Sequence, residues 1–278
     1  MPTVKVGDIN MYYEIHGEGK PLVLIPGGAG RMGWAPQIRE FSQKYQVISF
    51  DNRGEGQTDA PNYPYSTEMM VEDTAGLLDT IGVDKVHLAG FCHGGAIAQN
   101  FTLKYPQQVK SLILFATVAK MTGLMRHVSD VWYRLMQPGV DQETRFREQL
   151  SWVFTDKFFG SEEQIQASVN MSVSNPYPQP AYAWVCQVAF YKEHDTRERL
   201  GEISAPTLVI VGKEDIVTPV KCSGELARGI PNAELIILDG GGHMVNVENA
   251  AEFNQAVLGF LAEVEKCEKG TNPQKGIE

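Results

Sequence analysis

The sequence predicts an α/β fold in which a mostly parallel central sheet has helices on both faces, with a helical cap inserted near the middle of the chain. Short apolar runs alternate with segments of helical periodicity, which is the pattern of a parallel sheet covered on both sides. This alternation stops between Met121 and Leu200, so that segment forms a separate unit. With 278 residues, 43% of them hydrophobic, the chain is long enough for one large α/β domain with an insertion.

The predicted strands and helices follow one another along both halves of the chain. An N-terminal β-hairpin turns at Gly7-Asp8, and the later strands are short apolar runs. The strands are Val4–Val6, Asn10–His16, Leu22–Ile25, Tyr45–Phe50, Val86–Phe91, Val109–Ala116, Thr207–Val211 and Glu234–Leu238. The helices are 67–81, which stops at Gly82, 95–105, which stops before Pro106, and 249–264.

The segment between the two halves is rich in aromatic residues and has no convincing strand. Its tryptophans are Trp132, Trp152 and Trp184. We expect most of its rings to form the cap's own core and one or two to line a pocket beneath it, because small-molecule pockets are mostly apolar. The predicted division is a core domain of residues 1–120 and 201–265, a helical cap of residues 121–200 and a polar, flexible tail of residues 266–278.

The strand Val86–Phe91 leads into Cys92-His93-Gly94-Gly95 and then into a helix. A strand, a sharp turn and a helix with the spacing G-x-nucleophile-x-G form a nucleophile elbow, which lifts one side chain above the sheet. Here that side chain is the thiol of Cys92, where a serine is usual, either as the natural nucleophile or as a replacement for serine. A lone cysteine is more often a small buried hydrophobe, but the apex of such a turn favours a nucleophile.

A thiol nucleophile needs a base, and the base needs an acid to orient it. Asp215 follows the strand Thr207–Val211, and His243 follows the strand Glu234–Leu238 through a glycine-rich loop. Loops at the carboxyl ends of parallel strands gather at one crevice, so we expect Cys92, Asp215 and His243 to converge.

Each partner of Cys92 has a simpler interpretation. His243 could be a surface histidine, and Asp215 could cap a helix that starts near Pro219. Asp239 and Glu214 are rival acids, but Asp239 is too close to His243 along its own loop, and Glu214 is one residue from the expected position. The order of nucleophile, acid and histidine, each after a strand, favours the triad over these alternatives.

Hydrolysis of a carbonyl compound also needs two backbone N–H groups that face the developing oxyanion. We expect one from His93, the residue after the nucleophile, and the other from Gly28 in the loop after the strand Leu22–Ile25. The imidazole of His93 is expected to be a packing or surface group rather than a second base.

Four motifs carry a resemblance to a known family, namely Asp51-Asn52-Arg53-Gly54-Glu55-Gly56, Gly90–Gly95, Gly212–Asp215 and Gly241-Gly242-His243. Over nearly its whole length the chain resembles the α/β-hydrolase superfamily, and within it the capped group of 3-oxoadipate enol-lactonases, cofactor-free haloperoxidases and small carboxylesterases. Two features depart from that group. The first loop begins Pro26-Gly27 instead of His-Gly, and the nucleophile is cysteine, as in dienelactone hydrolases. Arg53 is expected to tie loops near the site or to form a surface ion pair.

The resemblance and the motifs predict a hydrolase that cleaves a small, partly apolar carboxylic ester, lactone or thioester through an acyl-cysteine intermediate. We expect a Cys92 thiolate paired with protonated His243, since helix N-termini and neighbouring imidazoles favour thiolates. Two alternatives stay open: an acyltransferase that uses the same triad, and a non-catalytic small-molecule receptor on a hydrolase scaffold.

Composition excludes several other classes of function. A net charge of −10 with no basic run makes nucleic acid and anionic membranes poor partners, and no apolar run approaches the length of a membrane helix. Four scattered cysteines fit a reducing, cytoplasmic compartment. The histidines have no metal-ligand spacing, and residues 27–30 lack the features of a nucleotide loop, so no metal or cofactor is expected. The predicted partner is a small-molecule substrate.

Overall fold

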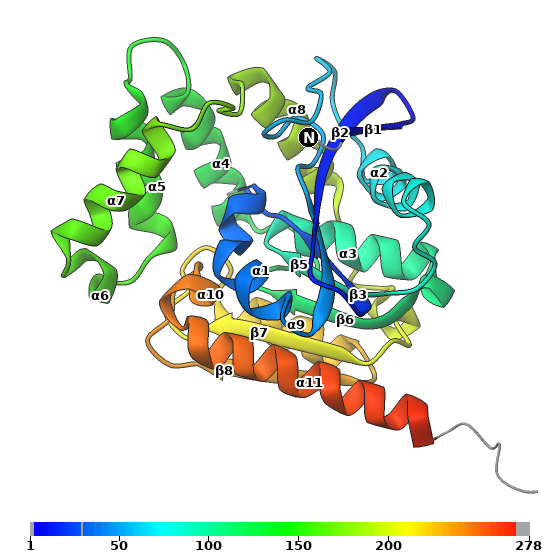
Figure 1. The fold of residues 1–278 in the computed structure, drawn as a ribbon. Coiled ribbons are helices and arrows are strands. Elements are labelled where there is room, and N and C mark those ends of the chain that lie inside the picture. Colours follow the sequence, from blue (N-terminus) through cyan, green and yellow to red (C-terminus); the bar gives the residue numbers. More distant parts are fainter. Residues whose placement is uncertain (1–2, 29, 271–278) are drawn as a thin grey trace, which may run out of the picture.

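A computed structural model describes residues 3–28 and 30–270 of the chain. Its centre is an eight-stranded sheet with the order β1-β2-β4-β3-β5-β6-β7-β8 (Figure 1). The hairpin of β1 and β2 and the pairing of β2 with β4 are antiparallel, and every later pair is parallel. This is the α/β-hydrolase fold with a mostly parallel sheet, as the sequence predicts.

The strands lie within a few residues of the predicted positions. β3, β5, β6 and β7 are almost wholly buried, which explains why their sequences are continuous apolar runs. The strands are β1 Thr3–Val6, β2 Ile9–His16, β3 Lys20–Ile25, β4 Tyr45–Phe50, β5 Val86–Phe91, β6 Val109–Phe115, β7 Thr207–Gly212 and β8 Ala233–Leu238.

Helices cover both faces of the sheet. One face packs against α2 (Thr67–Thr80), α3 (His93–Lys104) and α9 (Val220–Gly229), and the other against α1 (Ala35–Phe41) and α11 (Ala250–Gly270). Helix α1 is absent from the sequence prediction because it is only seven residues long and has a proline in its first turn.

Five helices between β6 and β7 form the insert. They are α4 Gly123–Leu135, α5 Gln142–Val153, α6 Asp156–Phe159, α7 Glu162–Val173 and α8 Ala181–Glu193. Figure 1 shows α8 beside the core and α5, α6 and α7 farther out. At the base of the insert, Lys120 and Asp195 form an isolated antiparallel bridge and an ion pair of 2.9 Å between Nζ and Oδ2. We propose residues 121–200 as the cap domain on this basis.

The last helix is longer than predicted. A short α10, Val245–Glu248, precedes α11, which continues to Gly270 rather than ending at residue 264. The polar residues of this extension are good helix formers, and no proline interrupts them before Pro273. Glu265 contacts Lys20 of β3 at 3.2 Å between Oε2 and Nζ, so this part of the helix is docked on the sheet. The predicted tail therefore starts too early at 266; residues 271–278 lie outside the described part.

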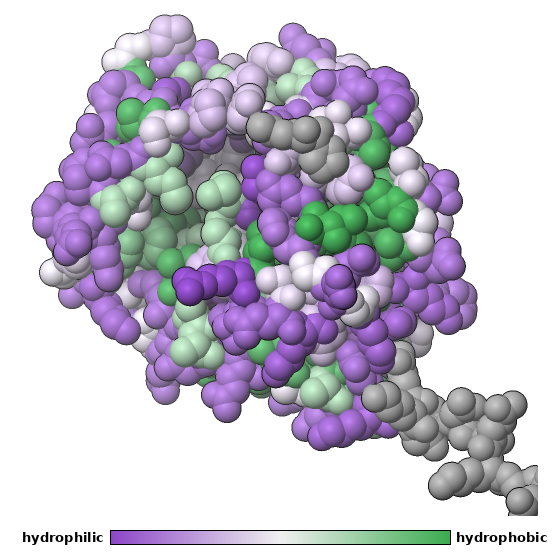
Figure 2. Space-filling view, in the orientation of Figure 1, coloured by the Kyte–Doolittle hydropathy of each residue, from purple (hydrophilic) through white to green (hydrophobic). Residues whose placement is uncertain are grey.

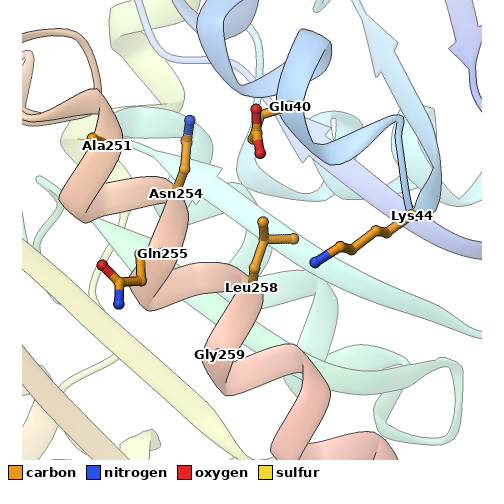
Figure 3. A pocket seen from close by; sticks show the side chains of 7 residues that line it. All are labelled: Glu40, Lys44, Ala251, Asn254, Gln255, Leu258 and Gly259. Carbon is orange, nitrogen blue, oxygen red and sulfur yellow. The ribbon is translucent and has the colours of Figure 1, made fainter.

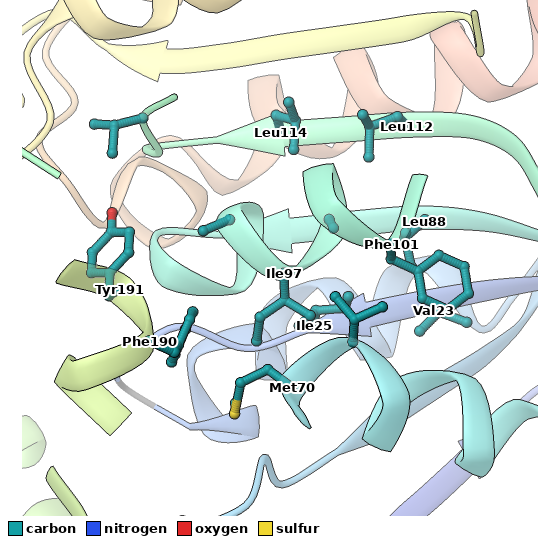
Figure 4. Packing of buried hydrophobic residues seen from close by; sticks show 14 of the residues in the cluster. Val23, Ile25, Met70, Leu88, Ile97, Phe101, Leu112, Leu114, Phe190 and Tyr191 are labelled. Carbon is teal, nitrogen blue, oxygen red and sulfur yellow. The ribbon is translucent and has the colours of Figure 1, made fainter. Parts of the chain in front are cut away.

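Side chains from strands and helices interdigitate in the core. Figure 4 shows Ile97 and Phe101 of α3 against the sheet, and Phe190 and Tyr191 on the cap helix α8 beside α3. Phe190 is fully buried, so α8 is anchored in the same hydrophobic cluster as the core domain. This packing determines which face of the cap lies above the end of β5.

Candidate active site

Cys92 lies at the apex of the turn between β5 and α3. Its backbone has φ 51° and ψ −119°, in the left-handed half of conformational space that non-glycine residues rarely adopt. The amide of Cys92 donates to the carbonyl of Phe115 on β6 at 3.2 Å, and the Thr117 hydroxyl donates to the carbonyl of Cys92 at 2.6 Å. The neighbouring strand therefore holds the strained turn in place.

The glycines on either side of Cys92 are required by close backbone approach. A Cβ on Gly90 would lie 2.6 Å from the carbonyl oxygen of Gly94, across the turn. A Cβ on Gly94 would lie 2.3 Å from the carbonyl oxygen of Pro26, in the loop after β3. The G-x-C-x-G spacing thus lets the turn close and lets the Pro26 loop pack against it.

Asp215, in the loop after β7, is 3% exposed and held by several donors. Its Oδ1 accepts the backbone N–H groups of Val217 and Thr218, both at 2.8 Å, and its Oδ2 accepts the Thr218 hydroxyl at 2.6 Å. The carboxylate therefore holds the turn that precedes α9, but it does not cap that helix, whose N-cap Pro219 has no side-chain cap hydrogen bond. The same Oδ2 also faces His243, so one carboxylate both holds this turn and contacts the histidine.

His243 is buried in the loop after β8, and its Nδ1 lies 2.9 Å from Oδ2 of Asp215. Burial disfavours the imidazolium, but the charges of Asp215 and Cys92 and hydrogen bonds to both outweigh it and raise the pKa of His243 to about 10. Burial raises the pKa of Asp215, but the charge of His243 and the hydrogen bonds from His243 and Thr218 outweigh it. The pKa of Asp215 is therefore lowered overall. The structure thus brings Cys92, Asp215 and His243 together.

The loop that carries His243 is also tied to the cap. Glu248 accepts the N–H of Gly242 at 2.8 Å through Oε2, and the N–H and hydroxyl of Thr155 at 3.0 and 2.6 Å through Oε1. The N–H of Met244 donates to the carbonyl of Val153, at the end of α5, at 3.0 Å. These bonds fix the histidine loop relative to the cap.

A cavity of about 690 Å³ lies between the cap and the core, with Cys92 and His243 in its wall. Gly28 and His93, the residues expected to supply oxyanion N–H groups, line the same cavity. His93 begins α3, and the first N–H groups of a helix have no partner within it. Figure 2 shows this face hollowed between the cap and the core, with green, apolar atoms in much of the visible wall.

Most of the cavity is apolar and comes from the cap. Trp132 and Trp184 line the cavity. A Cβ placed on Gly28 would lie 3.5 Å from the Trp184 ring, so this ring covers the loop after β3. The other apolar lining residues include Met125, Val128, Leu135, Met136, Phe146, Leu150, Val153, Phe154, Val188 and Val217.

One side of the cavity is polar and lies over the Asp51-x-Arg53 turn. Burial raises the pKa of Asp51 to about 6, and the Gln57 N–H and the Arg31 guanidinium, 3.4 Å from Oδ1, offset it only in part. Glu55 accepts from Gln187 of α8 at 2.7 Å and lies 3.4 Å from Nε2 of His93. The buried His93 imidazole is thus part of a polar contact between cap and core.

Three residues that the sequence analysis considered lie outside the cavity. Glu214 and Asp239 are exposed, and Asp239 pairs with Lys213 at 2.7 Å. Arg53 is 3% exposed and forms a buried bidentate pair with Asp73 of α2, at 2.6 and 2.7 Å, and a second pair with exposed Asp8 of the β1–β2 turn, at 3.0 Å between Nη2 and Oδ1.

A second depression, of about 570 Å³, lies between α1 and α11 (Figure 3). It is lined by Glu40, Lys44, Ala251, Asn254, Gln255, Leu258 and Gly259, and none of these belongs to the site at Cys92. Within residues 3–28 and 30–270 there is no group of three or more His, Cys, Asp or Glu side chains able to hold a metal ion. In the same residues, no helix has both the length and the apolar content to cross a bilayer.

Thr218, Glu248 and Tyr191 belong to the site but were not singled out from the sequence. The Asp-x-x-Thr spacing of Asp215 and Thr218 is a local signal that could have identified Thr218, because an aspartate often accepts hydrogen bonds two and three residues ahead. Tyr191 reaches the site only through the packing of α8 on the core, which no local pattern records, whereas Glu248 lies six residues from Gly242 at the end of α10.

Comparisons with known proteins agree with this geometry. The family model for the alpha/beta hydrolase fold matches residues 20–250. The chain is 31% identical to RutD of Azorhizobium caulinodans, provisionally named a carbamate hydrolase, over 96% of this chain and 100% of RutD. Among solved structures, a thermophilic esterase from Thermogutta terrifontis matches with a TM-score of 0.84 and 26% identity, covering 95% of this chain and 99% of the esterase.

A further solved structure is Est816, described as an N-acyl homoserine lactone degrading enzyme. It shares 30% identity and a TM-score of 0.79 with this chain, covering 93% of this chain and 100% of Est816. These proteins match over almost the full length of this chain. The chain belongs to the α/β-hydrolase family, in the group that includes esterases, lactonases and RutD-like hydrolases.

Proposed function

We propose that this protein hydrolyses small, partly apolar carboxylic esters, lactones or thioesters through an acyl intermediate on Cys92. The observation that carries the proposal is the position of Cys92: a cysteine at φ 51° at the apex of the elbow, in the wall of a cavity that also holds His243. Strain of this kind is retained where a reactive side chain must be presented. The 2.9 Å contact between His243 and Asp215 supplies the base and its orienting acid.

The first half of the reaction would form a bond between sulfur and the acyl carbon. The Cys92 thiolate attacks the carbonyl, and the electron pair of the double bond moves to oxygen. The N–H groups of Gly28 and His93 stabilise that oxyanion. When it collapses, the bond to the leaving group breaks, and His243, held protonated by Asp215, donates its proton to the departing oxygen or sulfur.

The second half would use the same histidine as a base. In the acyl-enzyme the sulfur carries no charge, so one of the influences that raises the pKa of His243 is gone. His243 is neutral after the first step and accepts a proton from water, which attacks the acyl carbon. Collapse breaks the carbon–sulfur bond, releases the carboxylic acid and restores the thiolate and the imidazolium.

The shape of the cavity supports the proposed substrate class. A volume of about 690 Å³ with mostly apolar lining fits a small acyl or alkyl group better than a polymer. The polar side at Asp51, Arg31 and Glu55 gives room for one polar substituent. The names of the esterase, of Est816 and of RutD add lactones and carbamates to the carbonyl compounds to be tested.

Acyl transfer is the alternative that shares this site. The same acyl-cysteine would react with a bound alcohol or thiol in place of water, so the triad does not distinguish the two. A non-catalytic receptor is a further alternative, and the intact Asp215–His243 pair speaks against it, because a receptor needs no buried charge pair beside a strained thiol.

The test is turnover of p-nitrophenyl acetate, a γ-lactone, a thioester and a carbamate by the wild type, Cys92→Ala and Cys92→Ser. We expect Cys92→Ala to abolish turnover and Cys267→Ser, at an exposed cysteine, to leave it unchanged. Product analysis with an added alcohol or thiol separates hydrolysis from transfer. Equal rates for Cys92→Ala and the wild type would refute the proposal.

A further inference from the structure

The hydroxyl of Tyr191 is a buried polar group that the mechanism above does not use. Tyr191 is 5% exposed, and its hydroxyl oxygen has no hydrogen-bond partner in the described part of the chain. Most buried polar atoms in folded proteins have a hydrogen-bond partner, because an unpaired donor loses its hydrogen bonds to water and gains none inside the protein. An unpaired hydroxyl in a packed helix therefore calls for a functional explanation.

Tyr191 lies at the reacting centre. Its side chain and Cys92 line the same cavity, and its ring packs edge-on against that of His93, the residue after Cys92, at 5.9 Å between centroids. Phe190, fully buried beside it, fixes this part of α8 on the core. Figure 4 shows the ring projecting from α8 with its hydroxyl at the far end. The hydroxyl thus comes from the cap, whereas the triad comes from the core.

The phenol stays protonated in this position. Burial raises the pKa of Tyr191 well above its usual range, and a negative charge on the nearby Cys92 sulfur would raise it further. A tyrosine in this state can donate a proton in a hydrogen bond but cannot act as a base. A neutral thiol is a weak acceptor, whereas a thiolate is a strong one, so the hydroxyl has a strong acceptor beside it wherever Cys92 is ionised.

We propose that the hydroxyl of Tyr191 is a second hydrogen-bond donor to the sulfur of Cys92, beside His243, and that it stabilises the thiolate. The proposal rests on the proposed function only in taking Cys92 as the reactive residue. A donor supplied by the cap makes the reactivity of the thiol depend on correct docking of α8. The cap would then have a chemical role in addition to enclosing the substrate.

The other titratable groups around this contact come from several elements. On the core side these are His93 at the start of α3, Asp215 after β7, Cys222 on α9 and His243 after β8, and on the cap side His194 at the end of α8. Glu55 lies 3.4 Å from Nε2 of His93. A tyrosine-to-phenylalanine change alters none of these residues, so it isolates the hydroxyl.

The experiment measures the rate at which iodoacetamide alkylates Cys92 across a pH series, followed by the mass of the peptide that contains Cys92. The full-length wild type is compared with Tyr191→Phe and with Tyr65→Phe. Tyr65 is a matched control, because it is also fully buried but lies outside the cavity lining and donates to the carbonyl of Pro61 at 2.9 Å. Melting temperature is recorded for all three proteins.

We expect Tyr191→Phe to shift the pH midpoint of alkylation upward by about one pH unit, since a hydrogen bond to a charged group is worth about that much. Measured below the alkylation midpoint, where Cys92 is a neutral thiol, its melting temperature should stay the same or rise, because the hydroxyl then has no strong acceptor to lose. Tyr65→Phe should melt at a lower temperature and keep the wild-type midpoint. A Tyr191→Phe profile that superimposes on the wild type would overturn the proposal, whatever its melting temperature. Because alkylation needs no substrate, this result is independent of whether esters are hydrolysed.

Discussion

Nδ1 of His243 lies 2.9 Å from Oδ2 of Asp215, although the two residues are 28 positions apart and follow different strands. Parallel pairing of β7 with β8, with Gly212 opposite Leu238, brings the two loops to the same edge of the sheet. A Cβ on Gly212 would lie 2.2 Å from the carbonyl oxygen of Gly241, so the loops pack backbone against backbone. The contact is therefore a consequence of strand register and glycine placement.

Loss of the Asp215 charge should disable the histidine. In Asp215→Asn the amide no longer balances an imidazolium, so the pKa of His243 falls and the ring loses its fixed orientation. We expect turnover of the best ester to drop by about 10³- to 10⁴-fold, as in other triads that lose the acid. Asp239→Asn, at the exposed rival acid, should keep wild-type activity. Steady-state kinetics on both variants decides between the two acids.

The charge pair should also make stability depend on pH. The pKa of His243 is raised from 6.5 to about 10 in the folded protein, so its contribution to stability is complete below pH 6.5 and is lost as the pH rises through about 10. Melting temperature measured against pH should therefore fall more steeply over this interval in the wild type than in His243→Gln. Parallel curves for the two proteins would show that the histidine is not charged in the folded state.

Gly94 should tolerate no larger residue. Alanine there would place its Cβ 2.3 Å from the carbonyl of Pro26, in the loop that leads to Gly28. We expect a loss of about 1–3 kcal/mol in the free energy of unfolding, the usual cost of overpacking, together with reduced turnover because the loop is displaced. Gly259→Ala is the control, since nothing lies within 4 Å of that Cβ on α11. It should stabilise the protein by about 0.5–1 kcal/mol, as measured by urea unfolding.

Arg53 should matter for stability more than for chemistry. Arg53→Met leaves Asp73 buried without its bidentate partner, which we expect to cost about 3–5 kcal/mol in the free energy of unfolding. The double variant Arg53→Met/Asp73→Leu removes both charges and should regain most of that loss. Equal destabilisation of the single and double variants in urea unfolding would contradict this account.

Local sequence was sufficient for the parts of the fold and the site that depend on local geometry. The buried strands are continuous apolar runs, and the glycines around Cys92 are where a strand must turn into a helix. Because the strand ends are predictable, the parallel sheet is enough to predict that the loops that carry Asp215 and His243 lie at the same edge, and Gly212 then lets them pack closely.

Features that depend on the docking of distant segments were not predictable. Arg53 looks like a surface residue until α2 covers it with Asp73. Tyr191 looks like one more aromatic residue of the cap until α8 packs beside the elbow. The extension of α11 to Gly270 is stabilised by the contact of Glu265 with Lys20, which lies at the other end of the chain. In each case the deciding partner is remote in sequence.

The most direct test of the central claim is to quench the reaction of the protein with p-nitrophenyl acetate by acid within the first turnover and to locate the acyl group by mass spectrometry. The account predicts one acetyl group per molecule, on the peptide that contains Cys92, and none in Cys92→Ala. Continued turnover by Cys92→Ala, or an acetyl group on any other residue of the competent enzyme, would contradict it.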